Sequence, residues 1–144
     1  MKANSKFDYI IVGGGLSGLH LSYCFLNDKY FKDYSILIID KGKSKMSDNY
    51  FSYWESGDGN WDSILKNKWN KGHFFSSKGK VKMDFSDYSY KTLSSSKFKE
   101  YVKKNIKKNK HFKFINDTVL NIREENNDVV VVGNKRNYYA KHIF

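Results

Sequence analysis

Proline is absent from this sequence of 144 residues, and cysteine occurs once, as Cys24. A single cysteine cannot form an internal disulfide, and it cannot provide the thiolate cluster of a Cys-rich metal site. The sequence therefore excludes folds that depend on either feature. A chain with so little cysteine also fits a reducing compartment, so we expect a cytoplasmic protein.

Long hydrophobic runs are absent as well. No apolar stretch approaches the ~20 residues that a membrane-spanning helix needs. Asp8 and the glycines that start at Gly13 interrupt the apolar segment that a signal peptide would require. We therefore expect neither a membrane span nor a leader, and we expect any membrane contact to be peripheral.

Arginine is scarce, although the formal net charge is +11. Arg123 and Arg136 are the only two, whereas lysines are scattered from Lys2 to Lys141 and accompany no nucleic-acid-binding signature. Phosphate recognition in nucleic-acid-binding proteins favours the planar guanidinium of arginine. We expect no nucleic-acid partner. A weak attraction to anionic membrane surfaces fits the scattered lysines better.

Apolar residues make up 40% of the chain, enough for one compact domain but not for two full ones. Residues 7–12 (FDYIIV) predict a buried parallel strand, and residues 35–39 (SILII) predict a second one. Between them, residues 16–26 predict a largely buried helix. This order predicts a right-handed βαβ unit. We expect the buried face of the helix to carry Leu19, Tyr23 and Leu26, and Cys24 to act there as a small apolar residue.

The remainder changes character twice. Residues 41–94 mix aromatic and polar residues without clear periodicity, which indicates an excursion from the sheet. A helix is expected over residues 95–108, with its first serine as the N-cap and with Phe98, Val102 and Ile106 facing inward. Short strands separated by Asn, Asp and Gly turns are expected at residues 111–115, 119–123, 129–132 and 138–144.

The glycine-rich segment after the first strand, GGGLSG, satisfies the pattern G-x-G-x-x-G. In this pattern Gly13 permits the tight turn, Gly15 lets the backbone approach a pyrophosphate, and Gly18 lets the helix pack closely on the sheet. The pyrophosphate then meets the unpaired N–H groups and the positive dipole end of the helix that starts near Leu16. The alternative is a glycine-rich turn that binds nothing.

Asp40 ends the second expected strand, about 20 residues after Gly18, where a carboxylate accepts hydrogen bonds from an adenosine ribose. Its charge would repel a 2′-phosphate, so NADP is disfavoured here, but the motif does not separate FAD from NAD. The expected cofactor-binding residues are Gly13, Gly14, Gly15, Leu16, Ser17, Gly18, Asp40 and Lys41.

Three segments together resemble FAD-dependent lycopene cyclases of the bacterial type, carotenoid enzymes that close β-ionone rings. Residues 7–18 resemble the opening of these enzymes. Residues 49–55 (NYFSYWE) resemble their aromatic segment after the second strand, although the usual Thr-Trp pair is replaced by Tyr-Phe. Residues 88–98 (YSYKTLSSSKF) resemble the segment that leads into the next helix, and Ser94 stands where bacterial relatives often carry arginine.

The resemblance implies a cofactor, a reaction and a substrate. The cofactor would be FAD in its reduced form, with NAD(P)H as the reductant. The enzyme would cyclise the ends of lycopene toward β-carotene without net redox change, and reduced flavin would stabilise the carbocation. In the family the acidic motif that performs the proton chemistry lies downstream of this region, so no catalytic residue is assigned here.

We therefore expect a doubly wound α/β fold, a Rossmann-like FAD-binding domain truncated at its C-terminus inside the last strand. Its expected parts are a first βαβ unit over residues 1–46, an excursion toward the substrate or cap region over 47–94, and a return helix, strand and β-meander over 95–144. The alternatives are an FAD/NAD(P)H-dependent oxidoreductase or monooxygenase of isoprenoid metabolism, and a nucleotide-binding fragment without activity of its own.

Other features carry two interpretations. The aromatic stretch over residues 50–61 fits either a groove for a long polyene or the core of the excursion. The lysines over residues 99–110 fit a solvated helix face better than a lipid-docking surface. Glu55, Asp58 and Asp62 are expected as solvated loop acids. The histidines, which show no metal-ligand spacing, are His20, His73, His111 and His142.

Overall fold

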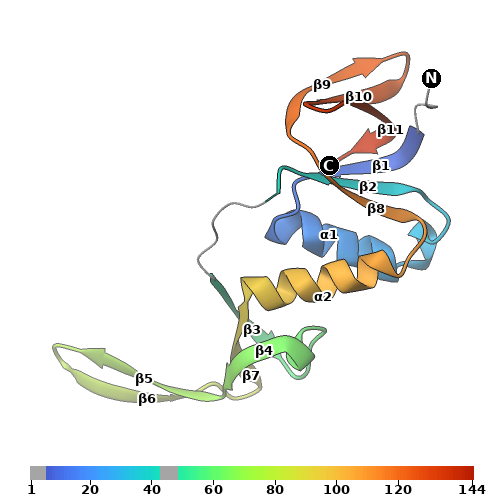
Figure 1. Ribbon diagram of the computed structural model, residues 1–144. Helices are drawn as coiled ribbons and strands as arrows, with labels where there is room; N and C mark the ends of the chain where they lie inside the picture. Colours follow the sequence, from blue (N-terminus) through green and yellow to red (C-terminus); the bar gives the residue numbers. More distant parts are fainter. Residues whose placement is uncertain (1–5, 43–48) are drawn as a thin grey trace. The chain divides into compact units, whose positions relative to one another are not determined.

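The computed structural model describes residues 6–42 and 49–144, which divide into two compact units (Figure 1). Unit 1 contains the chain before residue 46 and from Lys99 onward, and unit 2 contains the segment between them. The elements of unit 1 are β1 (Lys6–Val12), α1 (Leu16–Asn27), the 3-10 helix η1 (Lys29–Phe31), β2 (Ile36–Asp40), most of α2 (Ser95–Lys107), β8 (Phe112–Asn116), β9 (Val119–Glu125), β10 (Asp128–Gly133) and β11 (Asn137–Ile143).

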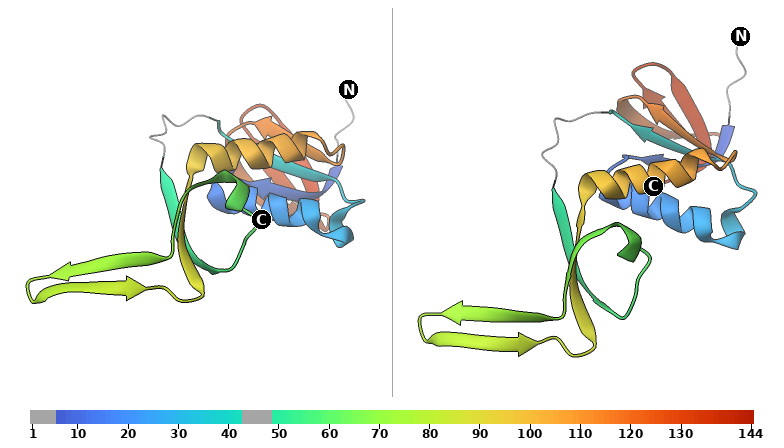
Figure 2. Two further views of the ribbon diagram at one scale, coloured as in Figure 1. Left: turned by 90° about the horizontal axis from the view of Figure 1, so that it is seen from below. Right: turned by 60° about the horizontal axis from the view of Figure 1, so that its bottom comes forward.

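A six-stranded sheet in the order β8-β2-β1-β11-β10-β9 forms the centre of unit 1. The first four strands run parallel, and β10 and β9 continue the sheet antiparallel. Helix α1 and the unit 1 part of α2 lie side by side along one face of the sheet (Figures 1 and 2). Since parallel strands need crossover connections, this helix placement follows from the strand order. The expected α/β fold is confirmed.

The core of the sheet lies on its central strands. In β2 the run Ile36–Ile39 is at most 1% exposed, because the strand has a neighbour on each side and is covered on both faces. Phe98, Val102 and Ile106 of α2 are buried, as predicted.

The start of α2 differs from the prediction. The backbone N–H of Lys97 donates to Oγ of Ser94 (3.4 Å), so the serine before the helix is the N-cap. Ser95 is already the first helical residue. Its hydroxyl is buried and has no hydrogen-bond partner within the described part of the chain.

The buried face of α1 also differs from the prediction. Its buried residues are Leu19, Ser22 and Phe25, whereas Cys24 is exposed. The prediction was right for Leu19 but wrong for Tyr23 and Leu26, which are only partly buried, because it assigned the face by hydrophobicity alone. Ser22 can occupy the buried face because its hydroxyl donates to the carbonyl oxygen of Gly18 (2.6 Å) and is thereby satisfied.

Unit 2 is built of strands, although its sequence shows no clear periodicity. A three-stranded antiparallel sheet has the order β3-β7-β4, and β5 and β6 form a separate two-stranded hairpin (Figure 2). Its elements are β3 (Tyr50–Ser56), the 3-10 helix η2 (Asp62–Ile64), β4 (Leu65–Trp69), β5 (Lys71–Ser76), β6 (Gly79–Asp84), β7 (Tyr88–Ser94) and the first residues of α2.

Among residues 6–42 and 49–144, no helix is both long enough and apolar enough to span a membrane.

Candidate dinucleotide-binding site

The glycine turn lies between β1 and α1, and Gly13 makes its first bend. Gly13 has φ +107°, a conformation that strains any residue with a side chain, while a Cβ there would meet no atom within 4 Å. Its N–H donates to the carbonyl oxygen of Ile39 (2.8 Å), which ties the turn to the end of β2. Backbone conformation, not crowding, therefore requires glycine at this position.

Crowding requires glycine at position 18 and disfavours a side chain at position 14. A Cβ at Gly18 would overlap the carbonyl oxygen of Gly13 and lie 3.3 Å from Cγ2 of Ile11, because α1 crosses the end of β1 closely. A Cβ at Gly14 would lie 2.9 Å from Cζ of Phe114 and 3.0 Å from Cβ of Asp40. The motif leaves the position of Gly14 variable, so the sequence did not reveal this second demand.

Gly15 differs from its neighbours. Its φ of −77° and ψ of −165° are open to any residue, and a Cβ there would meet nothing within 4 Å. Neither the backbone nor the packing of the described chain requires glycine here. Gly15 is also the N-cap of α1 and provides no side-chain cap, and the first turn carries no acidic residue. The first N–H groups of α1 thus receive no side-chain cap, an arrangement that suits an anion.

Asp40 is oriented by two backbone N–H groups. Its Oδ2 accepts from Gly14 (2.7 Å) and its Oδ1 accepts from Gly42 (2.8 Å), so the carboxylate is held at the end of β2 beside the glycine turn. Each carboxylate oxygen has a further lone pair and can still accept from a hydroxyl. Lys41 follows on the surface.

A pocket of about 330 Å³ opens at the carboxyl ends of β1 and β2. Ligands of open α/β sheets bind at this edge, outside the carboxyl ends of the strands. Asp40 and Gly13 line one side, and residues after β8 line the other. The complete lining is Val12, Gly13, Ile39, Asp40, Lys41, Asp117, Thr118 and Val119.

Asp117, which the sequence did not reveal, fixes the second wall of this pocket. It is 4% exposed, and its carboxylate accepts from the hydroxyl of Tyr138 (2.7 Å) and from the N–H groups of Thr118 (2.8 Å) and Lys135 (3.2 Å). Burial alone would raise the pKa of Asp117, but these hydrogen bonds hold it below its usual value. Its own N–H donates to the carbonyl oxygen of Asp40 (3.0 Å), which joins the two walls.

Removing the hydroxyl in Tyr138→Phe is expected to destabilise the protein by about 2 kcal/mol, because the ionised, buried Asp117 loses one of its donors. Denaturant unfolding measures this loss. Tyr139→Phe, on the same strand, is the control, with an expected change below about 0.5 kcal/mol. Equal stability of the two variants would contradict the assigned role of Asp117.

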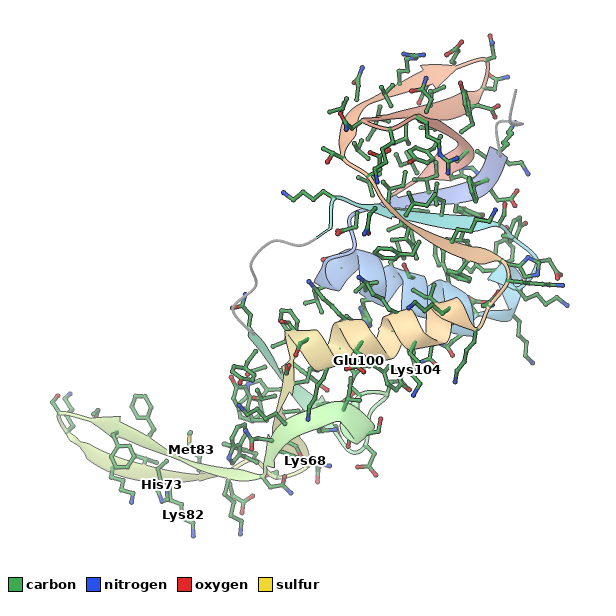
Figure 3. The ribbon with its side chains drawn as sticks, in the orientation of Figure 1. Lys68, His73, Lys82, Met83, Glu100 and Lys104 are labelled. Carbon is green, nitrogen blue, oxygen red and sulfur yellow. The ribbon has the colours of Figure 1, made fainter. Side chains whose placement is uncertain are left out.

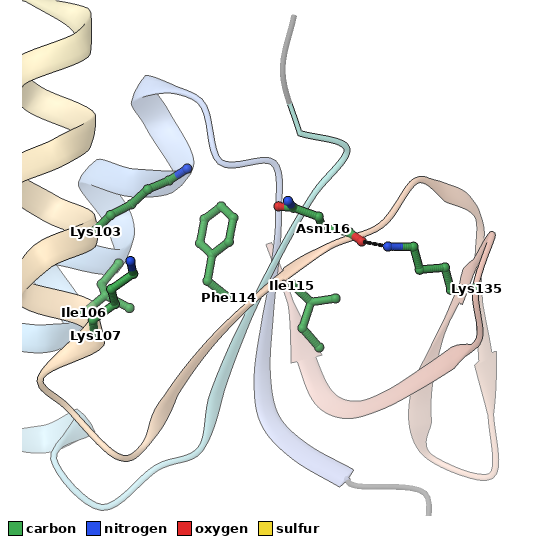
Figure 4. Close-up of a pocket in the computed structure, with 7 residues that line it drawn as sticks. All are labelled: Lys103, Ile106, Lys107, Phe114, Ile115, Asn116 and Lys135. Carbon is green, nitrogen blue, oxygen red and sulfur yellow. Dashed lines mark hydrogen bonds between the residues drawn. The ribbon is translucent and has the colours of Figure 1, made fainter.

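A second pocket, of about 550 Å³, lies beside α2 and β8 in unit 1 (Figure 4). Lys103 holds its ammonium 4.3 Å from the ring centre of Phe114, and Lys135 donates to the carbonyl oxygen of Asn116 (2.6 Å). Phe114 borders both this pocket and the glycine turn. Lysines give the pocket a positive lining, which consists of Lys103, Ile106, Lys107, Phe114, Ile115, Asn116 and Lys135.

The acids of unit 2 are not all solvated. Lys91, which is 0% exposed, donates to Glu55 (2.8 Å), to Asp62 (2.7 Å) and to the carbonyl oxygen of Gly57 (2.9 Å). The expectation of solvated loop acids was therefore wrong for Glu55 and Asp62. It holds for Asp58, whose side chain is 93% exposed. A buried lysine at a strand centre runs against hydropathy, and the sequence did not reveal it.

Burial alone would lower the pKa of Lys91, but its hydrogen bonds to Asp62 and Glu55 raise it well above the ordinary value. The same hydrogen bond lowers the pKa of Asp62. Lys91 is thus a charged group that closes the loop after β3 onto β7.

Comparison with known proteins places these features in a family. A sequence model of the family described as "Lycopene cyclase protein" matches residues 8–144. No curated protein matches the chain in sequence.

Solved structures show the fold. The p-nitrophenol 4-monooxygenase PnpA from Pseudomonas putida DLL-E4 is 16% identical, with a TM-score of 0.73 over 96% of this chain and 40% of the monooxygenase. PqsL from Pseudomonas aeruginosa, crystallised with 2-aminobenzoylacetate, is 9% identical, with a TM-score of 0.74 over 96% of this chain and 42% of PqsL. GidA from Aquifex aeolicus is 16% identical, with a TM-score of 0.64 over 99% of this chain and 25% of GidA.

These similarities identify the fold as a Rossmann-like FAD-binding domain, in agreement with the sequence-based expectation. The chain spans about 40% of the length of PnpA and PqsL.

Proposed function

The chain belongs to the lycopene cyclase family, and on that basis we propose that it is the FAD-binding part of an enzyme that cyclises the ends of lycopene to β-ionone rings. The reaction would proceed toward β-carotene without net redox change. The match over residues 8–144 supports the family-specific part of this proposal, and the FAD-binding fold supports the cofactor.

The single observation that carries the cofactor site is the open space at Gly15. Gly13, Gly14 and Gly18 are explained by the conformation and packing of the chain itself. At Gly15 neither the backbone conformation nor the described packing demands glycine, which fits the close approach of a bound group to the backbone. In the proposed site the N–H groups of Leu16 and Ser17 bind the pyrophosphate at the start of α1.

The adenosine half would occupy the pocket at the ends of β1 and β2. Asp40 would accept hydrogen bonds from the ribose hydroxyls, because its oxygens are already oriented by Gly14 and Gly42. Lys41 would lie at the rim, and Thr118 and Val119 would form the opposite wall. These residues bind and orient, and we assign none of them to proton transfer.

Bound FAD, kept reduced by NAD(P)H, would supply negative charge next to the carbocation that forms on lycopene. The contribution of this chain would be to fix the position of that charge through the rigid β1–turn–α1 connection. A fixed charge stabilises a transition state without reorganisation, which is the reason to hold the cofactor on a sheet edge.

Expression of the full-length protein in a lycopene-accumulating host tests the reaction. We expect lycopene to be replaced by β-carotene, and we expect the purified protein to be yellow from bound flavin. Unchanged lycopene in the presence of flavin-loaded protein would contradict cyclisation. A colourless protein that does not take up added FAD would contradict the cofactor assignment separately.

A second candidate function is an FAD- and NAD(P)H-dependent monooxygenase, which is favoured by the shared fold with PnpA and PqsL. This enzyme would consume NAD(P)H and oxygen in proportion to an oxidised product. The cyclase would release a product of unchanged elemental composition. Mass spectrometry of the product therefore separates the two functions.

Gly15→Ala tests the proposed site directly. We expect FAD affinity to fall at least about tenfold, because a methyl group would occupy the approach of the pyrophosphate. The apo-protein is expected to change in stability by less than about 1 kcal/mol, since alanine adopts this conformation without strain. Flavin titration and denaturant unfolding measure the two effects, with Asn27→Ala at the far end of α1 as the control. Unchanged FAD affinity in Gly15→Ala would count against the site.

A further inference from the structure

The β5–β6 hairpin of unit 2 presents both faces to solvent. Among residues 6–42 and 49–144, its strands pair only with each other, and all of their residues except Gly72 are exposed. An isolated two-stranded hairpin is marginally stable in water and needs a covering surface to gain stability.

One face of the hairpin is apolar. Phe74 pairs with Val81 across the strands, and Met83 lies two residues further along β6, so the three side chains share a face. They are 57%, 59% and 40% exposed, respectively. The opposite face carries His73, Lys80, Lys82 and one apolar side chain, Phe75, which is 68% exposed. Figure 3 shows Met83 and Lys82 leaving the ribbon on opposite sides.

The apolar face continues into the three-stranded sheet of unit 2. A Cβ at Gly72 would lie 2.8 Å from Cζ of Phe85 and 3.8 Å from Cε of Met83, so the ring of Phe85 lies next to the hairpin face. The same ring packs edge-on against the ring of Trp54, with 4.6 Å between the two ring centres. Trp54 is itself 54% exposed. A continuous exposed apolar surface of this kind marks an interaction site more often than chance exposure.

The charge of the hairpin is strongly positive. Residues 71–84 contain four lysines and a single acid, Asp84, which pairs with Lys71 at 3.6 Å. Lys78, Lys80 and Lys82 remain without a carboxylate partner in the described part of the chain. Lys80 and Lys82 are registered with Phe75 and His73, on the face opposite Phe74 and Val81, and Lys78 lies in the turn. Long lysine side chains can lay their apolar stems along such a surface and keep the ammonium group near charged headgroups.

We propose that the β5–β6 hairpin docks on an anionic lipid surface, with Phe74, Val81 and Met83 at the headgroup–acyl boundary and with the lysines bound to lipid phosphates. A membrane accepts aliphatic and aromatic side chains together, whereas single-stranded nucleic acid is bound by stacked aromatic rings and arginine. The hairpin has no arginine, and two of the three apolar-face residues are aliphatic. This docking requires neither flavin nor the cyclisation reaction.

Vesicle sedimentation of the full-length protein tests the docking. We expect binding to vesicles of phosphatidylcholine with about 30% phosphatidylglycerol to exceed binding to pure phosphatidylcholine by at least about tenfold, because anionic headgroups attract the lysines. Lys78→Gln/Lys80→Gln/Lys82→Gln is expected to weaken binding on the order of 100-fold, because each lysine near an anionic surface strengthens binding by about fivefold. Phe74→Ser/Val81→Ser is expected to weaken it at least about tenfold.

The matched control is Lys104→Gln/Lys108→Gln/Lys110→Gln, which removes the same charge from an exposed stretch in and after α2. It is expected to retain binding within about twofold, because those lysines lie outside the hairpin. Equal loss in the control and the hairpin variant would overturn the proposal in favour of general charge attraction.

A fluorescent dye on an introduced cysteine tests the docking without substitutions in the strands of the hairpin. In a Cys24→Ser background, an environment-sensitive dye on Ser77→Cys at the hairpin turn should shift to the blue with anionic vesicles, while a dye on Lys108→Cys should not. An unshifted dye at the turn would overturn the proposal. So would a dimer that the Phe74→Ser/Val81→Ser variant dissociates, or protection of the dye by an oligonucleotide alone.

Discussion

Gly18→Ala is expected to abolish FAD binding and to destabilise the protein by about 3 kcal/mol, the upper end of the usual cost of overpacking. The added Cβ would overlap the carbonyl oxygen of Gly13, which is a backbone atom and cannot rotate away. Helix α1 must then move off β1, and its N-terminal N–H groups move with it. In an exposed helix, Gly→Ala would stabilise the protein by about 1 kcal/mol. The sign of the change in unfolding free energy therefore shows whether α1 and β1 are in close contact at Gly18.

Denaturant unfolding and flavin titration of Gly18→Ala measure both losses. Gly15→Ala is the matched control, since it adds the same methyl group on the same turn where no atom lies within 4 Å. We expect Gly18→Ala to lose stability and flavin together, and Gly15→Ala to lose flavin affinity alone. A Gly18→Ala protein as stable as the unsubstituted one would show that α1 does not approach β1 as described.

Lys91→Met is expected to cost about 3 kcal/mol, the lower end of the range for removing one partner of a buried ion pair. The substitution leaves Glu55 and Asp62 without their shared cation, but these side chains are 31% and 25% exposed and keep some water. All tryptophans of the chain lie in unit 2, so denaturant unfolding followed by tryptophan fluorescence reports on this unit.

The control for Lys91→Met is Lys68→Met on the neighbouring strand. Lys68 also pairs with Asp62, at 3.5 Å, but its side chain is 36% exposed. An exposed pair contributes little, so the expected change is below about 1 kcal/mol. Equal effects of the two substitutions would contradict the importance of burial at Lys91.

The ion pairs of Lys91 also predict the pH range over which unit 2 is most stable. Because the pKa of Lys91 is raised, its contribution is complete below the unfolded value of about 10.4 and is lost as the pH rises beyond it. Because the pKa of Asp62 is lowered, its contribution is complete above about 3.9 and is lost as the pH falls. Lys91→Met should flatten the alkaline slope of unfolding free energy against pH, and an unchanged slope would contradict this assignment.

The βαβ unit was predictable because each signal is local. A β-branched run, three glycines and a helical stretch lie in one short segment, and the strands β1 and β2 agree with the prediction to within one residue at each end. The strands β8 to β11 were also expected, since Asn, Asp and Gly mark their turns. Ser22 was missed because its burial depends on a hydrogen bond to Gly18, which hydropathy does not report.

The strands of unit 2 were not predictable in the same way. Their order β3-β7-β4 joins segments that are distant in sequence. In the hairpin, β6 alternates between lysines and apolar residues, β5 has two adjacent phenylalanines, and neither strand has a buried face. In the dinucleotide site, the sequence indicated the glycine turn and Asp40 but not Asp117. Asp117 reaches the site through Tyr138 and Lys135, which follow it at some distance along the chain.

The chain enters unit 2 on β3 and leaves it on β7, and these two strands are paired, with Tyr50 registered with Ser94. This pairing has a kinetic consequence for the parallel sheet, in which β2 must find β8 across the whole of unit 2. The entropy lost on closing a loop grows with its length, and a loop pinched at its base by β3 and β7 behaves as a short one. We therefore expect unit 2 to fold early. Its formation would shorten the effective loop between β2 and β8 and so accelerate their pairing.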